Sequence, residues 1–158
     1  MSGIGWQPAA PDTRPPAGQE ELDAAVAALA GRRVAALTGA GFSTDSGLPD
    51  YRGPQARPRN PITYSQFVSS PDFRRHYWAR NHLGWHQMHA TEPNAGHYAL
   101  ARLEASGIIT GVITQNVDRL HQRAGSRTVI NLHGHYQLVR CLSCGHTLTR
   151  DELDARLQ

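Results

Sequence analysis

Three short apolar segments, each running into a glycine or a group of polar residues, constrain the fold of this chain more than any other feature. They read RRVAALTG at residues 32–39, IITGVITQN at 108–116 and TVINLHG at 128–134. Continuous apolar runs of this length are typical of strands buried in a parallel sheet. Helix-type sequences separate them, and strands that alternate with helices predict an α/β fold with right-handed crossovers.

The segments between the strands carry helix signals. QEELDAAVAALAG at residues 19–31 has apolar residues at helical spacing, acidic residues in its first turn and a glycine after its end. In PNAGHYALARLEASG at 93–107, Asn94 is a plausible N-cap and Gly107 a stop. We also expect helices in the aromatic-rich stretch 70–88 and in 117–125.

Two proline-rich segments are expected to be irregular. Residues 1–18 contain four prolines and three glycines without a periodic apolar face, which predicts a disordered tail. Residues 50–66 contain three prolines, which predicts a long loop of the kind that often carries function.

The charge pattern argues against a nucleic-acid groove. The formal net charge is +3, but all 16 basic residues are arginines, and they are scattered along the chain. No apolar run approaches the ~18 residues that cross a bilayer, and the N-terminus lacks the order of a signal peptide. The two cysteines, three positions apart, exclude a structural disulfide framework. We therefore expect a cytoplasmic protein that binds neither nucleic acid nor membranes.

The first candidate site follows the first strand, in LTGAGFSTDSGLPDYR at residues 37–52. Its turn Gly39-Ala40-Gly41 can bring backbone N–H groups close to a pyrophosphate. Thr44 stands where the dinucleotide fingerprint has a third glycine, so an ordinary glycine turn remains the alternative. Polar side chains follow the turn at Ser43, Asp50 and Arg52.

Two further candidate sites follow the other strands, at the same predicted sheet edge. Gln115, Asn116 and Asp118 crowd one strand end, where a helix N-cap would explain one of them but not three. His133 ends the last strand, where a neutral imidazole beside a sugar hydroxyl can act as a general base; His135 competes on position alone.

The other seven histidines, including His82, His86 and His89, are expected on solvated or loosely packed surfaces. His82 and His86 are four residues apart on a predicted helix, a spacing that can bind a metal. No acidic partner follows at zincin spacing, so this pair is discounted as a metal site.

Taken together, the motifs resemble the sirtuin family of NAD-dependent protein deacylases. GAGFSTDSGLPDYR is similar to the family's Gly-Ala-Gly-x-Ser…Ser-Gly-x-Pro-x-(Phe/Tyr)-Arg, and TQNVDRLHQRAGS to its Thr-Gln-Asn-x-Asp-x-Leu-His-x-x-Ala-Gly. LHG is similar to the motif with the catalytic histidine, which a Cys-x-x-Cys pair follows. The resemblance covers about residues 20–158, and RRHYWARNHLGW looks like the branch with mitochondrial and many bacterial members.

The resemblance implies roles for individual residues. It makes His133 the general base and gives catalytic roles to Asn116 and Asp118 as well. In the family's reaction the acyl-lysine oxygen attacks the nicotinamide ribose of NAD, and nicotinamide and an O-acyl-ADP-ribose are released. Tyr77 and Arg80 form a Tyr-x-x-Arg pair, which in some of the branch recognises acidic acyl groups; a surface ion pair of Arg80 is the alternative. The implied NAD pocket comprises Gly39, Ala40, Gly41, Ser43, Asp50, Tyr51, Arg52, Gln115, Asn116 and Asp118.

The resemblance also implies a fold: an incomplete half of a Rossmann-like parallel sheet, an inserted helical segment and the start of a small zinc module. Cys141 and Cys144 are the only cysteines, and such a pair supplies half of a four-ligand zinc site. The other two ligands are missing from the chain, and His135 or His146 would be strained substitutes. The expected domains are a tail (1–18), an NAD-binding core (19–50 and 98–134), a cofactor loop with the helical segment (51–97) and the truncated zinc module (135–158).

These features predict an NAD-dependent protein-lysine deacylase acting on acyl-lysine proteins or peptides, in a truncated form whose activity is in question. Two alternatives remain open at this point. One is mono-ADP-ribosyl transfer from the same NAD site. The other is a non-enzymatic fragment that pairs through zinc with cysteines of another chain. The acyl group, the target proteins and the oligomeric state are not predicted.

Overall fold

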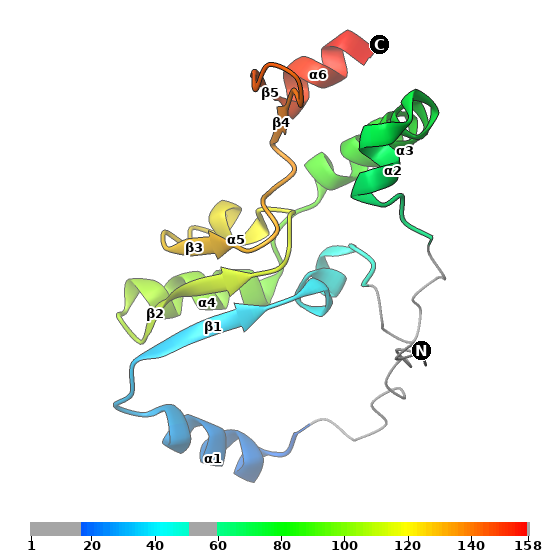
Figure 1. Cartoon of the computed structure of the whole chain (residues 1–158). Helices are drawn as coiled ribbons and strands as arrows, with labels where there is room; N and C mark the ends of the chain where they lie inside the picture. Colours follow the sequence, from blue (N-terminus) through cyan, green and yellow to red (C-terminus); the bar gives the residue numbers. More distant parts are fainter. Residues whose placement is uncertain (1–16, 51–59, 158) are drawn as a thin grey trace, which may run out of the picture.

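The computed structural model describes residues 17–50 and 60–157, and its centre is a three-stranded parallel sheet. The strands are β1 (Val34–Thr38), β2 (Ile109–Thr114) and β3 (Val129–Asn131), in the order β1–β2–β3 (Figure 1). Each strand lies within a segment that the sequence predicts to be a strand. The prediction of a Rossmann-like parallel α/β fold is therefore confirmed.

The crossover helix α4 (Ala95–Ala105) packs against β2. The side chain of Asn94 accepts a hydrogen bond from the backbone N–H of His97 at 3.2 Å, so the predicted N-cap is confirmed. The helix stops before Gly107, whose positive φ of 72° is readily adopted by glycine. The short helix α5 (Leu120–Arg123) joins β2 to β3 and is followed by Gly125.

A close backbone approach fixes the pairing of β2 with the start of β3. Gly111 has a φ of 152°, and an added Cβ would lie 2.6 Å from the backbone oxygen of Thr128. That same oxygen accepts a 2.8 Å hydrogen bond from the N–H of Val112. Only glycine lets the two strands meet here without displacement of one of them.

The first helix and first strand leave apolar surface open. Helix α1 (Gln19–Leu29) forms where predicted, but its residues are all exposed, including Leu22, Val26 and Leu29. In β1, the side chain of Leu37 is 70% exposed. Within the described residues, β1 and β3 each have one neighbouring strand, so both form open edges of the sheet.

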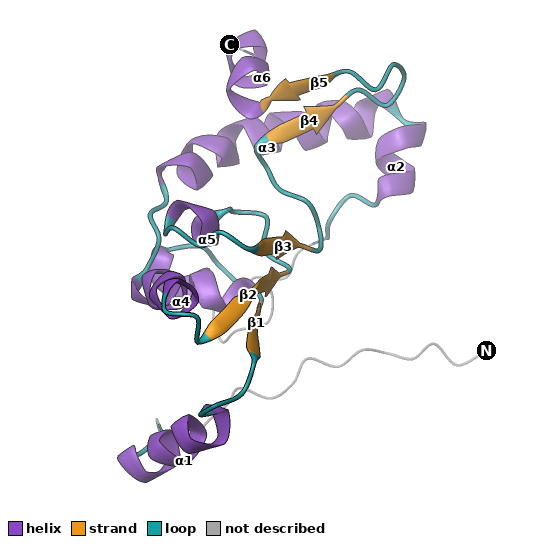
Figure 2. Ribbon diagram, turned by 90° about the vertical axis from the view of Figure 1, so that its left-hand side faces the viewer, coloured by secondary structure: helices purple, strands orange, loops and turns teal. Residues whose placement is uncertain are grey.

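A second group of elements lies beyond the carboxyl ends of the strands (Figure 1). It contains α2 (Tyr64–Ser69), α3 (Pro71–Ala90), the hairpin of β4 (Leu138–Arg140) and β5 (Thr147–Thr149), and α6 (Arg150–Leu157). In Figure 2 the hairpin lies in front of α3, and α6 packs against both of its strands. The expectation of a loop over 50–66 is wrong from Tyr64 onward, because Thr63 caps α2 through a 3.2 Å hydrogen bond from the N–H of Gln66.

Arg150 anchors α6 against α3. Its side chain is only 2% exposed, and its guanidinium carbon lies 5.3 Å and 5.0 Å from the ring centroids of Trp78 and Trp85. One guanidinium nitrogen, Nη2, donates to the backbone oxygen of Asn81 at 3.2 Å. The charge is thereby stabilised by two aromatic faces and a carbonyl dipole.

The interior of the described chain is unusually polar. Buried apolar side chains are few (Trp85, Ile109, Val112 and Leu120), and buried polar ones outnumber them. None of the described helices combines the length and hydropathy needed to span a membrane. The predicted tail falls almost wholly in residues 1–16, and the central part of the proline-rich segment in 51–59; both lie outside the described residues.

Candidate functional site

Polar segments after the three parallel strands meet at one edge of the sheet. After β1 the chain turns into a 3₁₀ helix, η1 (Ala40–Ser46); after β2 come Gln115–Asp118; after β3 comes His133. Parallel strands place their carboxyl ends together, so segments far apart in the sequence become neighbours. The three predicted sites are in this way brought to one place.

Asn116 lies at the centre of this edge and is buried. Its Nδ2 donates hydrogen bonds to the backbone oxygen of Gly39 at 3.0 Å and to Oγ of Ser43 at 3.1 Å. Its backbone N–H donates to Oγ1 of Thr114 at 3.0 Å. The two hydrogen bonds from Nδ2 fix the orientation of the side-chain carboxamide, including its oxygen.

Asp118 joins the site to the start of α5. Its Oδ2 accepts a 2.8 Å hydrogen bond from Ser43, and its Oδ1 accepts one of 2.9 Å from the N–H of Leu120. Between them, Arg119 adopts a left-handed φ of 62°. The N-cap of α5 is Arg119, which makes no side-chain cap hydrogen bond, so an N-cap role does not explain Asp118. Its carboxylate instead joins the first N–H of the helix to the turn after β1.

The glycine turn after β1 is open to a ligand. Gly39 has an extended φ of −140°, and Gly41 lies outside the left-handed region, so the turn itself does not require glycine at either position. No described atom lies within 4 Å of an added Cβ at either glycine. These observations favour close approach of a ligand such as a pyrophosphate over an ordinary glycine turn.

His133 is exposed at the edge, and its Nδ1 lies 3.2 Å from the backbone oxygen of Gln115. Because a carbonyl oxygen only accepts hydrogen bonds, Nδ1 carries the proton in this contact. In the neutral ring Nε2 is then unprotonated, which is the state a general base needs. His135, the competitor, is half-buried, and its Nδ1 is buried without a hydrogen-bond partner in the described structure.

Two histidines next to the site, His97 and His121, are buried. The expectation that they lie on solvated or loosely packed surfaces is wrong. His97 and His121 are 0% and 1% exposed, with ring centroids 4.7 Å apart. Burial, and after it the charge of His97, lowers the pKa of His121 to about 4, although Asp118 acts in the opposite sense. Burial also lowers the pKa of His97.

A chain of hydrogen bonds leads from this histidine pair to Asn116. Nε2 of His121 lies 2.8 Å from Oγ1 of Thr38, which donates to Oγ1 of Thr114 at 2.8 Å. Since Thr38 uses its own proton toward Thr114, it accepts from His121, whose Nε2 is therefore protonated. Thr114 in turn accepts the backbone N–H of Asn116. In the sequence, the position of His97 three residues after the N-cap Asn94 is the one signal that this histidine contacts the start of the helix.

The structure describes most, but not all, of the other predicted site residues. Asp50 is half-buried, while Tyr51 and Arg52 lie outside the described residues. Gln115 is exposed, and Ala40 is half-buried at the start of η1. Tyr77 lies on α3, where it packs against Phe67 at 5.0 Å between ring centroids, and Arg80 is exposed. The structure thus places the predicted acyl-recognition pair in the helical segment and not among the strand ends.

The two cysteines form an exposed turn between β4 and β5. Backbone N–H groups of Cys144 and Ser143 donate toward the Cys141 sulfur and lower the pKa of this thiol. The turn is closed by hydrogen bonds from Cys141 N–H to the His146 oxygen at 2.8 Å and from Gly145 N–H to the Cys141 oxygen at 3.0 Å. N–H groups that stabilise a thiolate fit the donor set of a zinc site, to which this chain brings two sulfurs.

Comparison with known proteins gives consistent matches. The profile of the Sir2 family matches residues 39–158. An NAD-dependent protein deacetylase 1 of Mycobacterium avium is 61% identical over 141 residues, covering 89% of this chain and 50% of the relative. The NAD-dependent protein deacylase Sirt4 of Drosophila melanogaster is 50% identical over 129 residues, covering 78% of this chain and 41% of the relative.

Solved structures agree with the sequence matches. A structure described as Sir2-p53 peptide-NAD+ superimposes with a TM-score of 0.72 at 41% identity, covering 88% of this chain and 55% of the other. A Sir2 mutant with p53 peptide and NAD gives a TM-score of 0.73 at 39% identity, covering 85% of this chain and 54% of the other. The chain spans about half the length of the relatives it matches.

Proposed function

Because this chain belongs to the Sir2 family, we propose that it carries the catalytic residues of an NAD-dependent protein-lysine deacylase. The observation that supports this most directly is the sheet edge where Asn116 and Asp118 contact Gly39 and Ser43 of the turn after β1, and where His133 contacts Gln115. An oriented amide, a carboxylate and an imidazole with an unprotonated Nε2 lie at adjacent strand ends. Relatives with the same family profile are named NAD-dependent deacetylases and deacylases.

We propose that NAD binds over the turn Gly39–Gly41, where it supplies a ribose carbon that accepts the acyl oxygen as nicotinamide leaves. Ser43 and Asn116 then hold the nicotinamide end, since both are fixed by mutual hydrogen bonds before any ligand arrives. Asp118 orients Ser43 and accepts from polar groups of the ligand. Gln115, Asp50, Tyr51 and Arg52 complete the proposed pocket.

His133 is the proposed general base. The hydrogen bond from its Nδ1 to the Gln115 carbonyl holds the neutral ring in one tautomer and leaves Nε2 as the proton acceptor. Removing a positioned general base lowers rates by roughly 10²–10⁴-fold. We expect the His133 ring to act on a ribose hydroxyl of the bound NAD.

The proposed substrates are acyl-lysine proteins or peptides, with Tyr77 and Arg80 as candidates for recognition of an acidic acyl group. The peptide complexes among the structural relatives support a peptide substrate of this kind. Cys141 and Cys144 are proposed as two of the four ligands of a structural zinc ion. We also propose a cytoplasmic location, since the two cysteines are not joined in a disulfide.

Nicotinamide release tests the proposal. The purified chain is incubated with NAD and an acetyl-lysine peptide, with a succinyl-lysine peptide in parallel, and NAD binding is measured by calorimetry. We expect NAD binding and peptide-dependent release that H133A lowers at least about 100-fold while NAD binding persists. H135A is the matched control and should retain release. Absence of both binding and release, or a loss in H135A with none in H133A, would contradict the assignment.

A further inference from the structure

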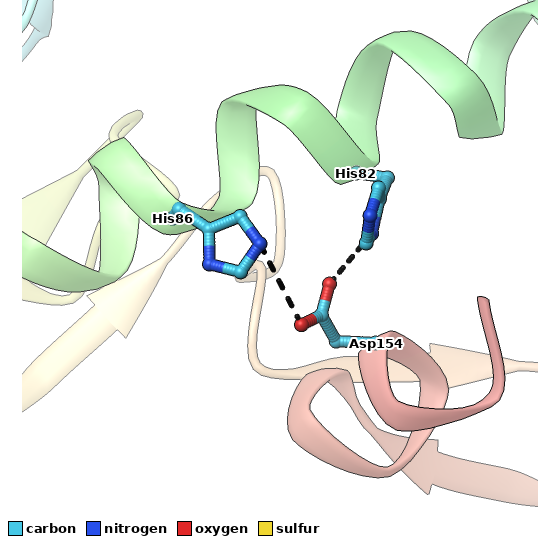
Figure 3. Close-up of side chains that lie close together, drawn as sticks. All are labelled: His82, His86 and Asp154. Carbon is cyan, nitrogen blue, oxygen red and sulfur yellow. Dashed lines mark ion pairs between the residues drawn. The ribbon is translucent and has the colours of Figure 1, made fainter. Parts of the chain in front are cut away.

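A second group of potential metal ligands lies away from the strand-end site, between α3 and α6. His82 and His86 are one helical turn apart on α3 and point toward Asp154 of α6 (Figure 3). Nδ1 of His82 lies 2.7 Å from Oδ1 of Asp154, and Nε2 of His86 lies 3.8 Å from Oδ2. Each imidazole therefore faces a different oxygen of one carboxylate.

The spacing of these atoms suits a transition-metal ion. All three donor atoms lie within 4.8 Å of one another. Ligand bonds of about 2.1 Å in a tetrahedral site place neighbouring ligand atoms about 3.4 Å apart. The separations of 2.7 Å and 3.8 Å fall on either side of that value, so small side-chain rotations would admit an ion. Two imidazoles and one carboxylate are a donor set that zinc and related divalent ions prefer.

Burial distinguishes this cluster from an incidental surface pair. The Asp154 side chain is 11% exposed and that of His82 is 26% exposed, whereas His86 is 63% exposed and opens the group to solvent. The two less exposed side chains, His82 and Asp154, are held in place by packing, while His86 lies on the side that is open to water. Arg150, one turn earlier on α6, lies over the rings of Trp78 and Trp85 and so holds the helix that carries Asp154 against α3.

We propose that His82, His86 and Asp154 bind a divalent transition metal, with Zn²⁺ as the natural probe, and that the ion ties α6 to α3. The sequence places no acidic residue at the spacing of a zincin helix after His82 and His86. The structure supplies that residue from another helix. The site is distinct from the Cys141/Cys144 turn, whose donors are thiolates, and it is independent of the proposed deacylase activity.

Metal binding in a cysteine-free background tests the proposal. The variant C141S/C144S removes the thiolate ligands, and Zn²⁺ binding is then measured by calorimetry together with the melting temperature. We expect one Zn²⁺ per chain and a higher melting temperature with the ion. Adding H82N, H86N or D154N should weaken Zn²⁺ binding at least about 100-fold. Loss of a residue that only hydrogen-bonds to a metal ligand costs at most about that much.

His89 provides a matched control. It lies on the same helix, and its Nδ1 is 4.0 Å from Oδ1 of Asp151, but both side chains are well exposed. H89N should leave Zn²⁺ affinity unchanged. Co²⁺ adds a second readout: visible absorption without a sulfur-to-metal charge-transfer band identifies nitrogen and oxygen ligands. Circular dichroism checks each variant, and H86N, at the most exposed ligand, keeps the test valid if H82N does not fold.

Some results would overturn the proposal. They are the absence of Zn²⁺ binding in C141S/C144S, undiminished binding in all three ligand variants, or an equal loss in H89N. A drop in stability of H82N that occurs without any metal response would mark the group as an ion pair only.

Discussion

The ring of His121 on α5 lies 2.8 Å from the hydroxyl of Thr38 at the end of β1. This bond connects the crossover between β2 and β3 to the neighbouring strand, and through Thr114 it reaches the backbone of Asn116. A neutral imidazole is therefore built into the support of the site. Its protonation would place a charge in the interior that the nearby Asp118 only partly offsets.

Stability is expected to fall in mild acid because of this ring. An unfolded histidine titrates near 6.5, whereas the pKa of His121 in the folded chain is about 4. Between these values the unfolded state binds more protons, so the free energy of unfolding decreases as the pH drops, by up to about 3 kcal/mol at pH 4. Urea unfolding at several pH values measures the slope. H121N should be less stable at pH 7 but should show a shallower slope; an unchanged slope would contradict the assignment.

Replacement of Gly111 by alanine should destabilise the sheet. The added Cβ would meet the Thr128 carbonyl, and its φ of 152° is strained for alanine, so we expect a loss of about 2–4 kcal/mol. Gly84 is the control: it lies inside α3 with open space around it, and G84A should be neutral or more stable by up to about 1 kcal/mol. Thermal unfolding of both variants gives the comparison. If G111A and G84A changed the stability equally, the close approach of Gly111 to Thr128 would not be what requires glycine at position 111.

The carboxylate of Glu104 is expected to hold α4 to the start of β3. It accepts hydrogen bonds from the backbone N–H groups of Arg127 at 2.9 Å and Thr128 at 2.7 Å. Burial raises the pKa of this carboxyl, but the two N–H donors outweigh that effect, and the net pKa is lowered. Its contribution is present above the unfolded pKa and is lost as the pH falls through the folded one. E104Q should lower the free energy of unfolding by about 1 kcal/mol at pH 7 and by less in acid, as measured by urea unfolding. A loss of stability that does not change with pH would contradict the role of the Glu104 charge.

Lysine at position 150 should loosen α6 from α3. The guanidinium of Arg150 lies over the rings of Trp78 and Trp85, and lysine lacks the planar group that stacks on aromatic faces. We expect R150K to lose about 1 kcal/mol and to change tryptophan fluorescence. R156K, on the exposed side of α6, is the control and should leave both signals unchanged. A fluorescence spectrum of R150K that matches the parent would refute the contact.

The parts of the fold that the sequence predicted correctly have local causes. The three strands were marked by apolar runs ending at glycine or polar residues, and α4 by the cap at Asn94 and the stop at Gly107. Two helices were missed, α2 and α6, although each begins with a capping box: Thr63 with Gln66, and Thr149 with Glu152. The strands β4 and β5 are three residues each, too short for a periodic signal.

The site was predictable to the extent that parallel strands align their ends. Asn116, Asp118 and Ser43 meet as expected because they follow neighbouring strands. The burial of His97 and His121 was not predictable from composition, since it depends on packing between α4, α5 and the turn after β1. The approach of Asp154 to His82 likewise arises from the docking of α6, which no local pattern encodes.

The pairing of β1 has a consequence for the order of folding. β2, α5 and β3 are consecutive in the chain and can associate soon after they are made, with α4 just before them. Thr38 and Thr114, by contrast, meet across 76 positions, so β1 joins only after a long loop has closed. During synthesis the first strand therefore leaves the ribosome well before its partner exists. Until then its exposed edge and Leu37 are available to chaperones or to other chains.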